Sequence, residues 1–274
     1  MKRILTADLF LPLQEELITL LRSLSPDDWQ KPTIAGAWRV KDIVTHILDG
    51  DLRRLSLHRD RYATAPPATE TYSELVNFLN DLNASWVTAT ERLSPPMLIG
   101  LLEWSAPQIA DFFLSLPPDD TAFWAVAWAG EEESRNWMDI GRDYTEKWHH
   151  QAQIRDAVGA TGLRSRQWLH PVFELAMYAL PYAFRNTDAP DGSALSLRIE
   201  GEAGGKWSLL REANQWRITE GAIENPTAQV EMSADSAWRL FFNGLKPTDA
   251  EQRIETIGEV TLCTTFLTVR SVMV

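Results

Sequence analysis

The stretch from residue 137 to residue 158 decides the fold, and it reads WMDIGRDYTEKWHHQAQIRDAV. Its large apolar side chains recur at the spacing of one helix face, at Trp137, Ile140, Tyr144 and Trp148. Gly159 follows directly, at the position where helices commonly end. The pattern therefore predicts one long helix from about Glu131 to Val158.

Helical spacing of apolar residues also dominates the sequence before this helix. It predicts helices over residues 9–21, 40–48 and 72–93, and a further one that ends at about Leu116. The proline pairs Pro95-Pro96 and Pro117-Pro118 separate the later helices, because proline cannot continue a helix interior. Long helices without strand patterns between them are typical of an antiparallel bundle, and we predict a four-helix bundle over residues 1–162.

The second half of the chain changes from helical spacing to strict alternation. After a helix expected over 166–185, apolar residues alternate near 195–199, 207–209, 216–218 and 230–232, with Gly- and Asn-containing turns between them. Two helical segments, 236–242 and 259–273, close the chain. The expected fold class is therefore α plus α+β, in which the bundle precedes a small C-terminal α+β domain with an antiparallel sheet over 163–274.

The composition of the chain limits the classes of molecule that it can bind. The chain has 274 residues, of which 26 are Lys or Arg and 38 are Asp or Glu, for a net charge of −12. Such an acidic chain without a basic stripe is unsuited to binding nucleic acid. Its apolar runs are too short for a membrane span, so neither partner is expected. A small-molecule substrate is expected instead, and the oligomeric state stays open.

Cys263 is the single cysteine of the sequence. It excludes an intramolecular disulfide and any metal site built from several cysteines. A chain without disulfides fits the reducing cytoplasm, which is the expected location.

One group of residues could carry chemistry. Glu146 and His150 are four residues apart, so their side chains lie one helical turn from each other and can share a metal ion. His46 borders the apolar stripe of the second helix and would join them if the two helices are neighbours. Two imidazoles and one carboxylate leave a coordination position open, as in catalytic zinc sites and in non-haem iron sites.

Two features of this group leave alternatives open. Glu146 lies about 200° around the helix from Tyr144, so either the helix is buried on both sides or the pair faces solvent. His149 points about 100° away from His150, and we prefer His150 as the ligand because it completes the four-residue spacing.

Two stretches resemble one known family. WRVKDIVTHI (38–47) resembles the second-helix motif of the mycothiol-dependent maleylpyruvate isomerase family, and EKWHHQAQIRDA (146–157) resembles its later ligand-bearing helix. The second half is similar to the family's sterol-carrier-like C-terminal domain, through GGKW (204–207), the strand at Trp216 and IGE (257–259). The resemblance implies a DinB-like metal-binding four-helix bundle followed by that domain.

The resemblance also implies a site and a reaction. His46, Glu146 and His150 would be the metal ligands, with Zn²⁺ the family's usual ion. The family isomerase adds the thiolate of a small-molecule thiol to a cis double bond, and related bundles transfer such thiols to electrophiles. Mycothiol or another low-molecular-weight thiol would therefore be the cofactor, since Cys263 lies in an apolar helix. The family's C-terminal domain contributes an arginine, for which four candidates remain: Arg198, Arg211, Arg217 and Arg239.

Residues on the helix of His46 extend the candidate site. Arg53 is seven residues beyond His46 on the same face, and we predict that it binds a substrate carboxylate, with Arg54 as the adjacent alternative. Asp42 and Asp49 are within reach of the histidine and could orient its ring, or simply be solvated. His58 and His170 have no partner pattern and are expected to be surface or helix-capping residues.

Two other functions compete with a metal-dependent thiol enzyme. Water in the open metal position would give a hydrolase, which needs an additional general base. Alternatively, the C-terminal domain binds an apolar ligand and the metal site is vestigial. A stoichiometric metal ion retained by the protein would favour either enzyme hypothesis over the binding-protein hypothesis.

Overall fold

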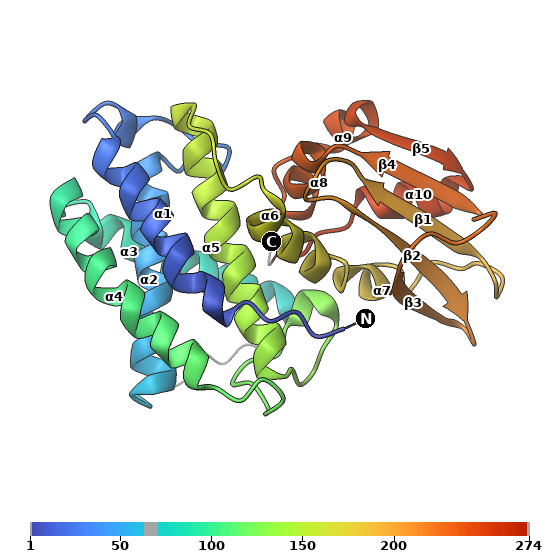
Figure 1. Ribbon diagram of the computed structural model, residues 1–274, viewed down its shortest axis with the longest axis horizontal. Helices are drawn as coiled ribbons and strands as arrows, with labels where there is room; N and C mark the ends of the chain where they lie inside the picture. The colour runs from blue at the N-terminus through green and yellow to red at the C-terminus, as the bar shows by residue number, and fades with distance from the viewer. Residues whose placement is uncertain (1, 63–70, 273–274) are drawn as a thin grey trace.

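The computed structural model describes residues 2–62 and 71–272, with a helical N-terminal part beside a C-terminal α+β part (Figure 1). The larger helices of the N-terminal part are α1 (Phe10–Ser23), α2 (Val40–Arg54), α3 (Tyr72–Thr90), α4 (Pro95–Ser115) and α5 (Asn136–Val158). All five helices expected from the apolar spacing are present. The fifth begins at Asn136 and not near Glu131, because Arg135 pairs with Thr121 in an isolated β-bridge just before it.

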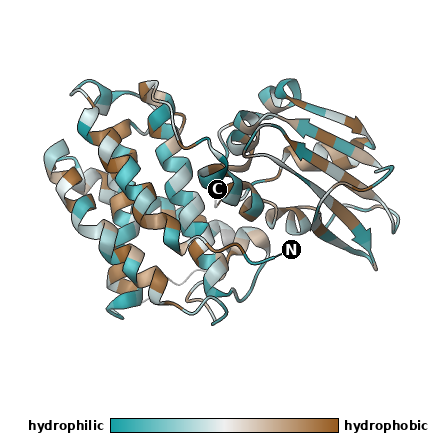
Figure 2. Cartoon of the chain, in the orientation of Figure 1, coloured by the Kyte–Doolittle hydropathy of each residue, from teal (hydrophilic) through white to brown (hydrophobic). Residues whose placement is uncertain are grey.

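Four of these helices close into a bundle. Helix α1 packs against α4, α4 against α2, α2 against α5, and α5 against α1. Helix α3 lies outside this ring, against α2. Figure 2 shows apolar and polar residues alternating around these helices, which is the pattern expected when one face of each is buried. The prediction of a helical bundle is confirmed, with α3 as an additional outer helix.

The C-terminal part starts with two helices where one was expected. Helix α6 (Arg166–Ala176) ends before α7 (Ala179–Ala183). Pro181 has no backbone N–H to donate to the carbonyl of Met177, which weakens a continuous helix here, and that carbonyl accepts from the N–H of Leu180 at 3.1 Å. Helix α6 packs directly against α5 of the bundle. Helix α7 packs against the short 3₁₀ helix Ala127–Ala129, which precedes α5.

A five-stranded sheet forms the outer half of the C-terminal part. Its strands are β1 (Ala194–Ile199), β2 (Gly205–Glu212), β3 (Gln215–Glu220), β4 (Ala228–Met232) and β5 (Ile254–Gly258). They lie in the order β3-β2-β1-β4-β5. The expected antiparallel sheet is mostly confirmed, but β1 and β4 pair in parallel. Alternation alone could not reveal this, because side chains alternate in the same way in both kinds of pairing.

Three helices accompany the last strands: α8 (Ala234–Phe241), α9 (Pro247–Arg253) and α10 (Val260–Leu267). Helices α8 and α10 correspond to the two expected segments, whereas α9 and β5 were missed. The last helix ends at Leu267 and therefore earlier than expected, while the expected end at Met273 itself lies outside the described residues. No helix in the described ranges is both long and apolar enough to cross a membrane.

One apolar core runs through both parts of the chain. It joins Phe10, Tyr144 and Trp148 of the bundle to Phe173 of α6 and Trp238 of α8. A second, smaller core lies between α1, α2 and α4. The expected boundary at residues 162/163 falls in the connection between α5 and α6, and independent folding of the two sides stays a prediction.

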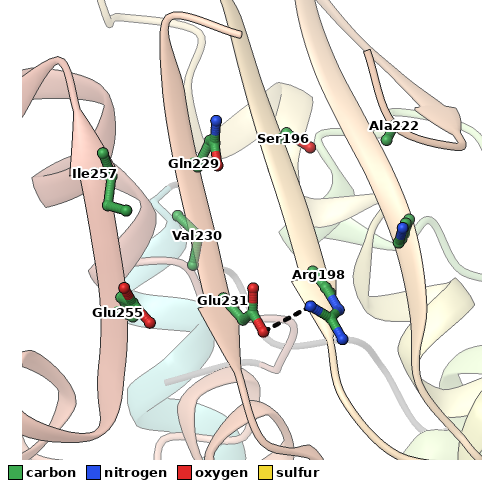
Figure 3. Close-up of a pocket in the computed structure, with 9 residues that line it drawn as sticks. Ser196, Arg198, Ala222, Gln229, Val230, Glu231, Glu255 and Ile257 are labelled. Atoms are coloured by element: carbon green, nitrogen blue, oxygen red, sulfur yellow. Dashed lines mark ion pairs between the residues drawn. The ribbon is translucent and has the colours of Figure 1, made fainter. Parts of the chain in front are cut away.

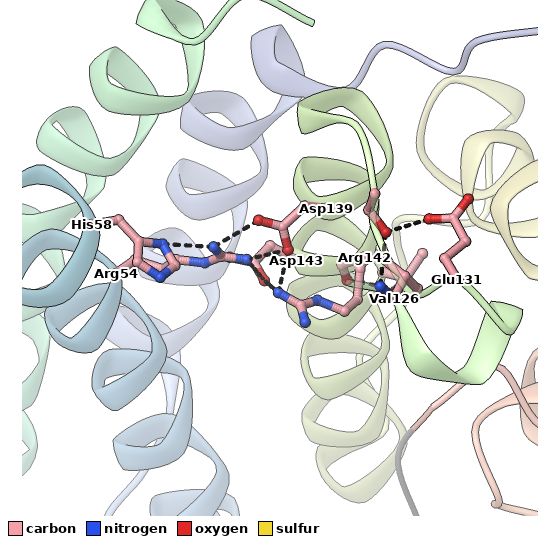
Figure 4. Close-up of polar contacts among 9 residues, drawn as sticks. Arg54, His58, Val126, Glu131, Asp139, Arg142 and Asp143 are labelled. Carbon is pink, nitrogen blue, oxygen red and sulfur yellow. Dashed lines mark hydrogen bonds and ion pairs between the residues drawn. The ribbon is translucent and has the colours of Figure 1, made fainter. Parts of the chain in front are cut away.

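Ionic contacts hold α2 against the first half of α5. The buried guanidinium of Arg54 donates to both oxygens of Asp139, each at 2.8 Å, and to Asp143 at 2.6 and 2.9 Å (Figure 4). Arg142 adds a second cation, 2.5 Å from Asp139. Burial would raise the pKa of Asp143, but Arg54 and Arg142 lower it to about 2. The two positive charges of Arg54 and Arg142 thus balance the two negative charges of Asp139 and Asp143 between α2 and α5.

His58 belongs to the same cluster and not to the surface. Arg54 donates to its Nδ1 at 2.7 Å, which leaves the proton of the neutral ring on Nε2. Phe123 and Trp124 pack on the ring, with centroids 4.2 and 4.4 Å away. Burial and then the Arg54 charge lower the pKa of His58 to about 4. The sequence has no spacing signal that connects residue 58 with residues 123–143.

We expect Arg54→Met to destabilise the fold severely. The substitution leaves two buried carboxylates with Arg142 as their one remaining cation, and an uncompensated buried charge typically costs about 3–5 kcal/mol in the free energy of unfolding. Urea unfolding at pH 7 measures it. Arg59→Met, which removes an exposed cation paired with Asp60, is the control and should cost under about 1 kcal/mol. Equal losses for the two variants would contradict the assignment.

The His58 pKa predicts a pH effect on stability. Because the folded pKa of about 4 lies below the ordinary 6.5, the folded state favours the neutral ring. Its contribution to stability is fully present above pH 6.5 and declines as the pH falls toward 4. The free energy of unfolding of the wild type should therefore fall relative to that of His58→Phe over this window. A difference that stays constant between pH 7 and 4.5 would show that His58 does not titrate this way.

Candidate metal centre

Helices α2 and α5 bring the three expected ligands together. His150 Nε2 lies 3.5 Å from Glu146 Oε2 on α5. The His46 ring, from α2, lies edge-on to the His150 ring with the centroids 4.7 Å apart. The two helices are therefore neighbours in the bundle, as the convergence of the three side chains requires.

Helix α5 is buried on both sides, which decides between the two orientations left open by the sequence. Its Tyr144 row packs into the core, and on the opposite side His150 is only 8% exposed. The Glu146 side chain keeps one third of its surface exposed. Glu146 and His150 are thus enclosed by the protein, and the Glu146 carboxylate is the part of the pair that solvent reaches.

A hydrogen bond selects the ring nitrogen that His150 presents to the site. His150 Nδ1 lies 2.9 Å from Gln153 Oε1, so with this amide orientation Nδ1 carries the proton. The lone pair of Nε2 then faces Glu146. Second partners of this kind orient ligand imidazoles in metal sites. His46 Nδ1 is buried without any hydrogen-bond partner within the described ranges.

His149 approaches the same carboxylate but differs in its hydrogen bonding. Oxygen and nitrogen atoms of Glu146, His149 and His150 lie within 4.8 Å of one another. However, His149 Nδ1, which is 3.9 Å from Glu146, lies 3.0 Å from the carbonyl of Thr145 and must carry a proton to bond it. The ring also stacks on Phe242 of the C-terminal part, at 4.6 Å and 12°. This nitrogen is therefore a donor. His46 lies outside the group of side chains whose ligand atoms are all within 4.8 Å of one another, and its role as the third ligand stays a prediction.

The electrostatics of the cluster suit a bound cation. Burial, and then the neighbouring His150, lower the pKa of His46 well below 6.5, and the same two causes lower that of His149 to about 3. Burial would raise the pKa of Glu146, but His149 and His150 lower it to about 2. At neutral pH Glu146 is thus a carboxylate, and the rings of His46 and His149 are neutral. Neutral imidazole and ionised carboxylate are the forms that bind metal.

The donor set fits a divalent transition metal. Two imidazole nitrogens and one carboxylate oxygen match the ligands of catalytic zinc sites and of non-haem iron sites. The unpartnered His46 Nδ1 supports this fit, because a buried ring nitrogen without a hydrogen bond is costly unless it binds something. Trp38 packs beside the cluster, 4.9 Å from the His46 ring and 6.4 Å from the His150 ring.

The charged neighbours of His46 on α2 have partners of their own. Asp42 accepts from the backbone N–H and the guanidinium of Arg39 and so caps the helix. Asp49 forms an ion pair with Arg53 Nε at 2.9 Å, although the two groups are not aligned as a hydrogen bond. Arg53 also donates to Asn83 of α3 at 3.3 Å. Its charge lies close enough to His46 to contribute to the lowered pKa of that ring.

The C-terminal arginine candidates lie in different environments. Arg239 of α8 reaches α5, where it pairs with Asp156 at 2.6 Å. Arg211 is buried over the Trp216 ring. Arg198 pairs with Glu231 on the open face of the sheet, beside a depression of about 150 Å³ (Figure 3). That depression is lined by residues of the C-terminal part alone and is separate from the metal centre.

Comparison with known proteins identifies the relatives of this chain. The family model of the mycothiol maleylpyruvate isomerase N-terminal domain matches residues 10–155. This range covers more than half of the chain, from α1 to α5, and it contains His46, Glu146 and His150. The chain belongs to this family. The matched range also contains the stretch between Pro95 and Glu131.

Solved structures of a family member share the fold. Two crystal structures of the mycothiol-dependent maleylpyruvate isomerase, one of them of a mutant, align with 95% of this chain and 98% of their own. The TM-scores are 0.55 for the mutant and 0.53 for the other, at 12% and 14% sequence identity. An uncharacterized protein of Mycobacterium tuberculosis, from strains CDC 1551 / Oshkosh and H37Rv, is 25% identical over 209 residues, 76% of this chain and 77% of the relative.

Gln153 provides a test of the ring orientation in this family member. Gln153→Leu removes the acceptor for His150 Nδ1 and should weaken Zn²⁺ binding by about 10–100-fold, as is typical for such partners. Gln153→Glu keeps an acceptor and should keep or strengthen binding. Competition with a chromophoric chelator measures both. Equal affinity of the Leu and Glu variants would show that the contact does not orient a ligand.

Proposed function

We propose that this protein is a divalent-metal-dependent enzyme that uses a low-molecular-weight thiol. The observation that carries the proposal is the convergence of His46, Glu146 and His150 from two helices, with one ring nitrogen left unpartnered. These three residues would hold the metal ion, with Zn²⁺ as the ion we expect. Family membership supports the choice of reaction class.

The chemistry follows from the donor set. When bound there, the ion would lower the pKa of a thiol in its open position, so that a nucleophilic thiolate is present near neutral pH. Gln153 holds the His150 ring with Nε2 toward the site, and the half-buried Trp38 and the buried Phe242 cover one side of the cluster. The accessible edge at Glu146 is where small molecules would enter.

The thiol must come from outside the chain. Cys263 is the one cysteine of the sequence, and it lies buried in α10 of the C-terminal part, where burial raises its pKa. We therefore propose mycothiol, or another thiol of that size, as the second small molecule. Such thiols are kept reduced in the cytoplasm, where we place the protein.

The reaction we propose is a cis–trans isomerisation or a thiol S-transfer. Both begin with attack of the thiolate on an electrophilic carbon of the substrate. We assign Arg53 to the substrate carboxylate, since its charge acts on His46 and about a third of its side chain is exposed. To do this its guanidinium would exchange the contact with Asn83 for the substrate.

Metal content is the first test. We expect about one Zn²⁺ per chain in protein purified without chelator or affinity tag, measured by elemental analysis. His46→Ala and His150→Ala should each abolish metal retention while the helical circular dichroism stays close to that of the wild type. Near-wild-type metal content in both variants would show that His46 and His150 do not form a metal site.

A thiol-dependent assay then tests the reaction class. Turnover of a maleylpyruvate-type substrate, or S-conjugation of an electrophile, should require both the ion and the added thiol. Cys263→Ser is the control and should leave turnover unchanged. An inactive but folded Cys263→Ser protein would contradict the external thiol, and loss of metal with full activity would contradict the role of the ion.

A further inference from the structure

A buried polar cluster joins the four helices of the bundle. Each helix contributes one side chain to it: Gln14 from α1, Asp51 from α2, Ser105 from α4 and Lys147 from α5. We call these four residues the polar node. Asp51 is completely buried, and the Lys147 side chain is only 9% exposed.

Asp51 is the centre of the polar node. Its Oδ2 accepts from Gln14 Nε2 at 3.0 Å and from Ser105 Oγ at 2.8 Å. Its Oδ1 accepts from Lys147 Nζ. One carboxylate thus receives three hydrogen bonds, one from each of the other three helices.

The polar node is not needed for stability in the way an apolar core is. Replacing a buried ion pair with apolar residues of similar shape is often neutral or stabilising, because the ion pair must overcome the loss of hydration of both charges. What directional hydrogen bonds add is a unique alignment. Apolar faces can pack in neighbouring registers, whereas Asp51 meets its three donors in one register only.

This register sets the metal centre. Lys147 directly follows Glu146 and precedes His150 by three residues, and Asp51 follows His46 by five. A slip of one residue between α2 and α5 would displace the ligands by about 1.5 Å. Metal–ligand distances tolerate only about 0.2 Å, so the alignment of the two helices must be held far more closely than packing alone requires.

We propose that the polar node positions His46 against Glu146 and His150, so that Asp51 and Lys147 are positioning residues for the metal centre. The inference rests on the proposed function, because it concerns the same metal site. It predicts that metal affinity depends on the polar node even where stability does not.

The main test replaces the polar node with apolar shape analogues. The variant carries Gln14→Met, Asp51→Leu, Ser105→Ala and Lys147→Met. We expect cooperative unfolding at a temperature close to that of the wild type, together with Zn²⁺ binding weaker by about 10-fold or more. The visible spectrum of the Co²⁺-loaded variant should also change, since it reports ligand geometry, which a purely structural role would leave unaltered.

A matched control removes another ion pair of α5. Arg155 pairs with Glu16 of α1 at 3.2 Å and has no contact with Asp51. Glu16→Leu combined with Arg155→Met should leave Zn²⁺ affinity within about twofold of the wild type. If the control and the apolar variant lose affinity equally, the effect is general loosening of α5 and the inference is wrong.

A second variant covers the case in which the four-site variant does not fold. Asp51→Asn with Lys147→Met keeps an acceptor for Gln14 and Ser105 and removes only the link to α5. It should weaken Zn²⁺ binding in the same direction. Wild-type affinity and an unchanged Co²⁺ spectrum in this variant would overturn the inference.

Binding to the wild type separates the two proposals. If the wild type binds Zn²⁺ and the polar-node variants bind it equally well, the positioning inference fails and the proposed function stands. If the wild type binds neither Zn²⁺ nor Co²⁺, the proposed function fails and the inference fails with it. Weakened binding in the variants alone supports both.

Discussion

The antiparallel packing of α2 against α5 is the constraint on which the rest of the structure depends. Along this seam Arg54 meets Asp139 and Asp143, and Asp51 meets Lys147 one to two turns further on. In both places every buried charge has a fixed counter-ion. One turn further on, Glu146 faces histidine rings, and its ion-pair contacts among the described residues are with histidines only. This difference in charge balance is the physical argument for a cation at that level.

Much of the helical half could be predicted because its signal is local. The spacing of Trp137, Tyr144 and Trp148 is a property of one segment, and so is the four-residue interval between Glu146 and His150. Membership in the mycothiol maleylpyruvate isomerase family confirms the resemblance of the two motifs. The choice of His46, Glu146 and His150 as ligands stays a prediction, which the geometry supports and metal analysis must test.

The remaining features depend on contacts between distant segments. The polar node joins residues 14, 51, 105 and 147, and no spacing within one helix could connect them. Lys147 in particular resembles a solvated helix residue until Asp51 is placed beside it. The same holds for His58, which the sequence suggested was at the surface and which the loop at Phe123 and Trp124 covers. The short strand β5 was missed because it follows α9 directly, without a turn signal between them.

The C-terminal part contributes to the surroundings of the metal centre, although the family match ends at residue 155. Phe242 stacks on His149, and Arg239 holds Asp156 at the end of α5. Both contacts come from α8 and the residue that follows it, so the C-terminal part helps to bury α5. Relatives that keep the ligand-bearing helices but differ in this second half would therefore present different walls to a substrate. Because the walls and the ligands come from separate stretches of the chain, the choice of substrate can change while the metal centre stays the same.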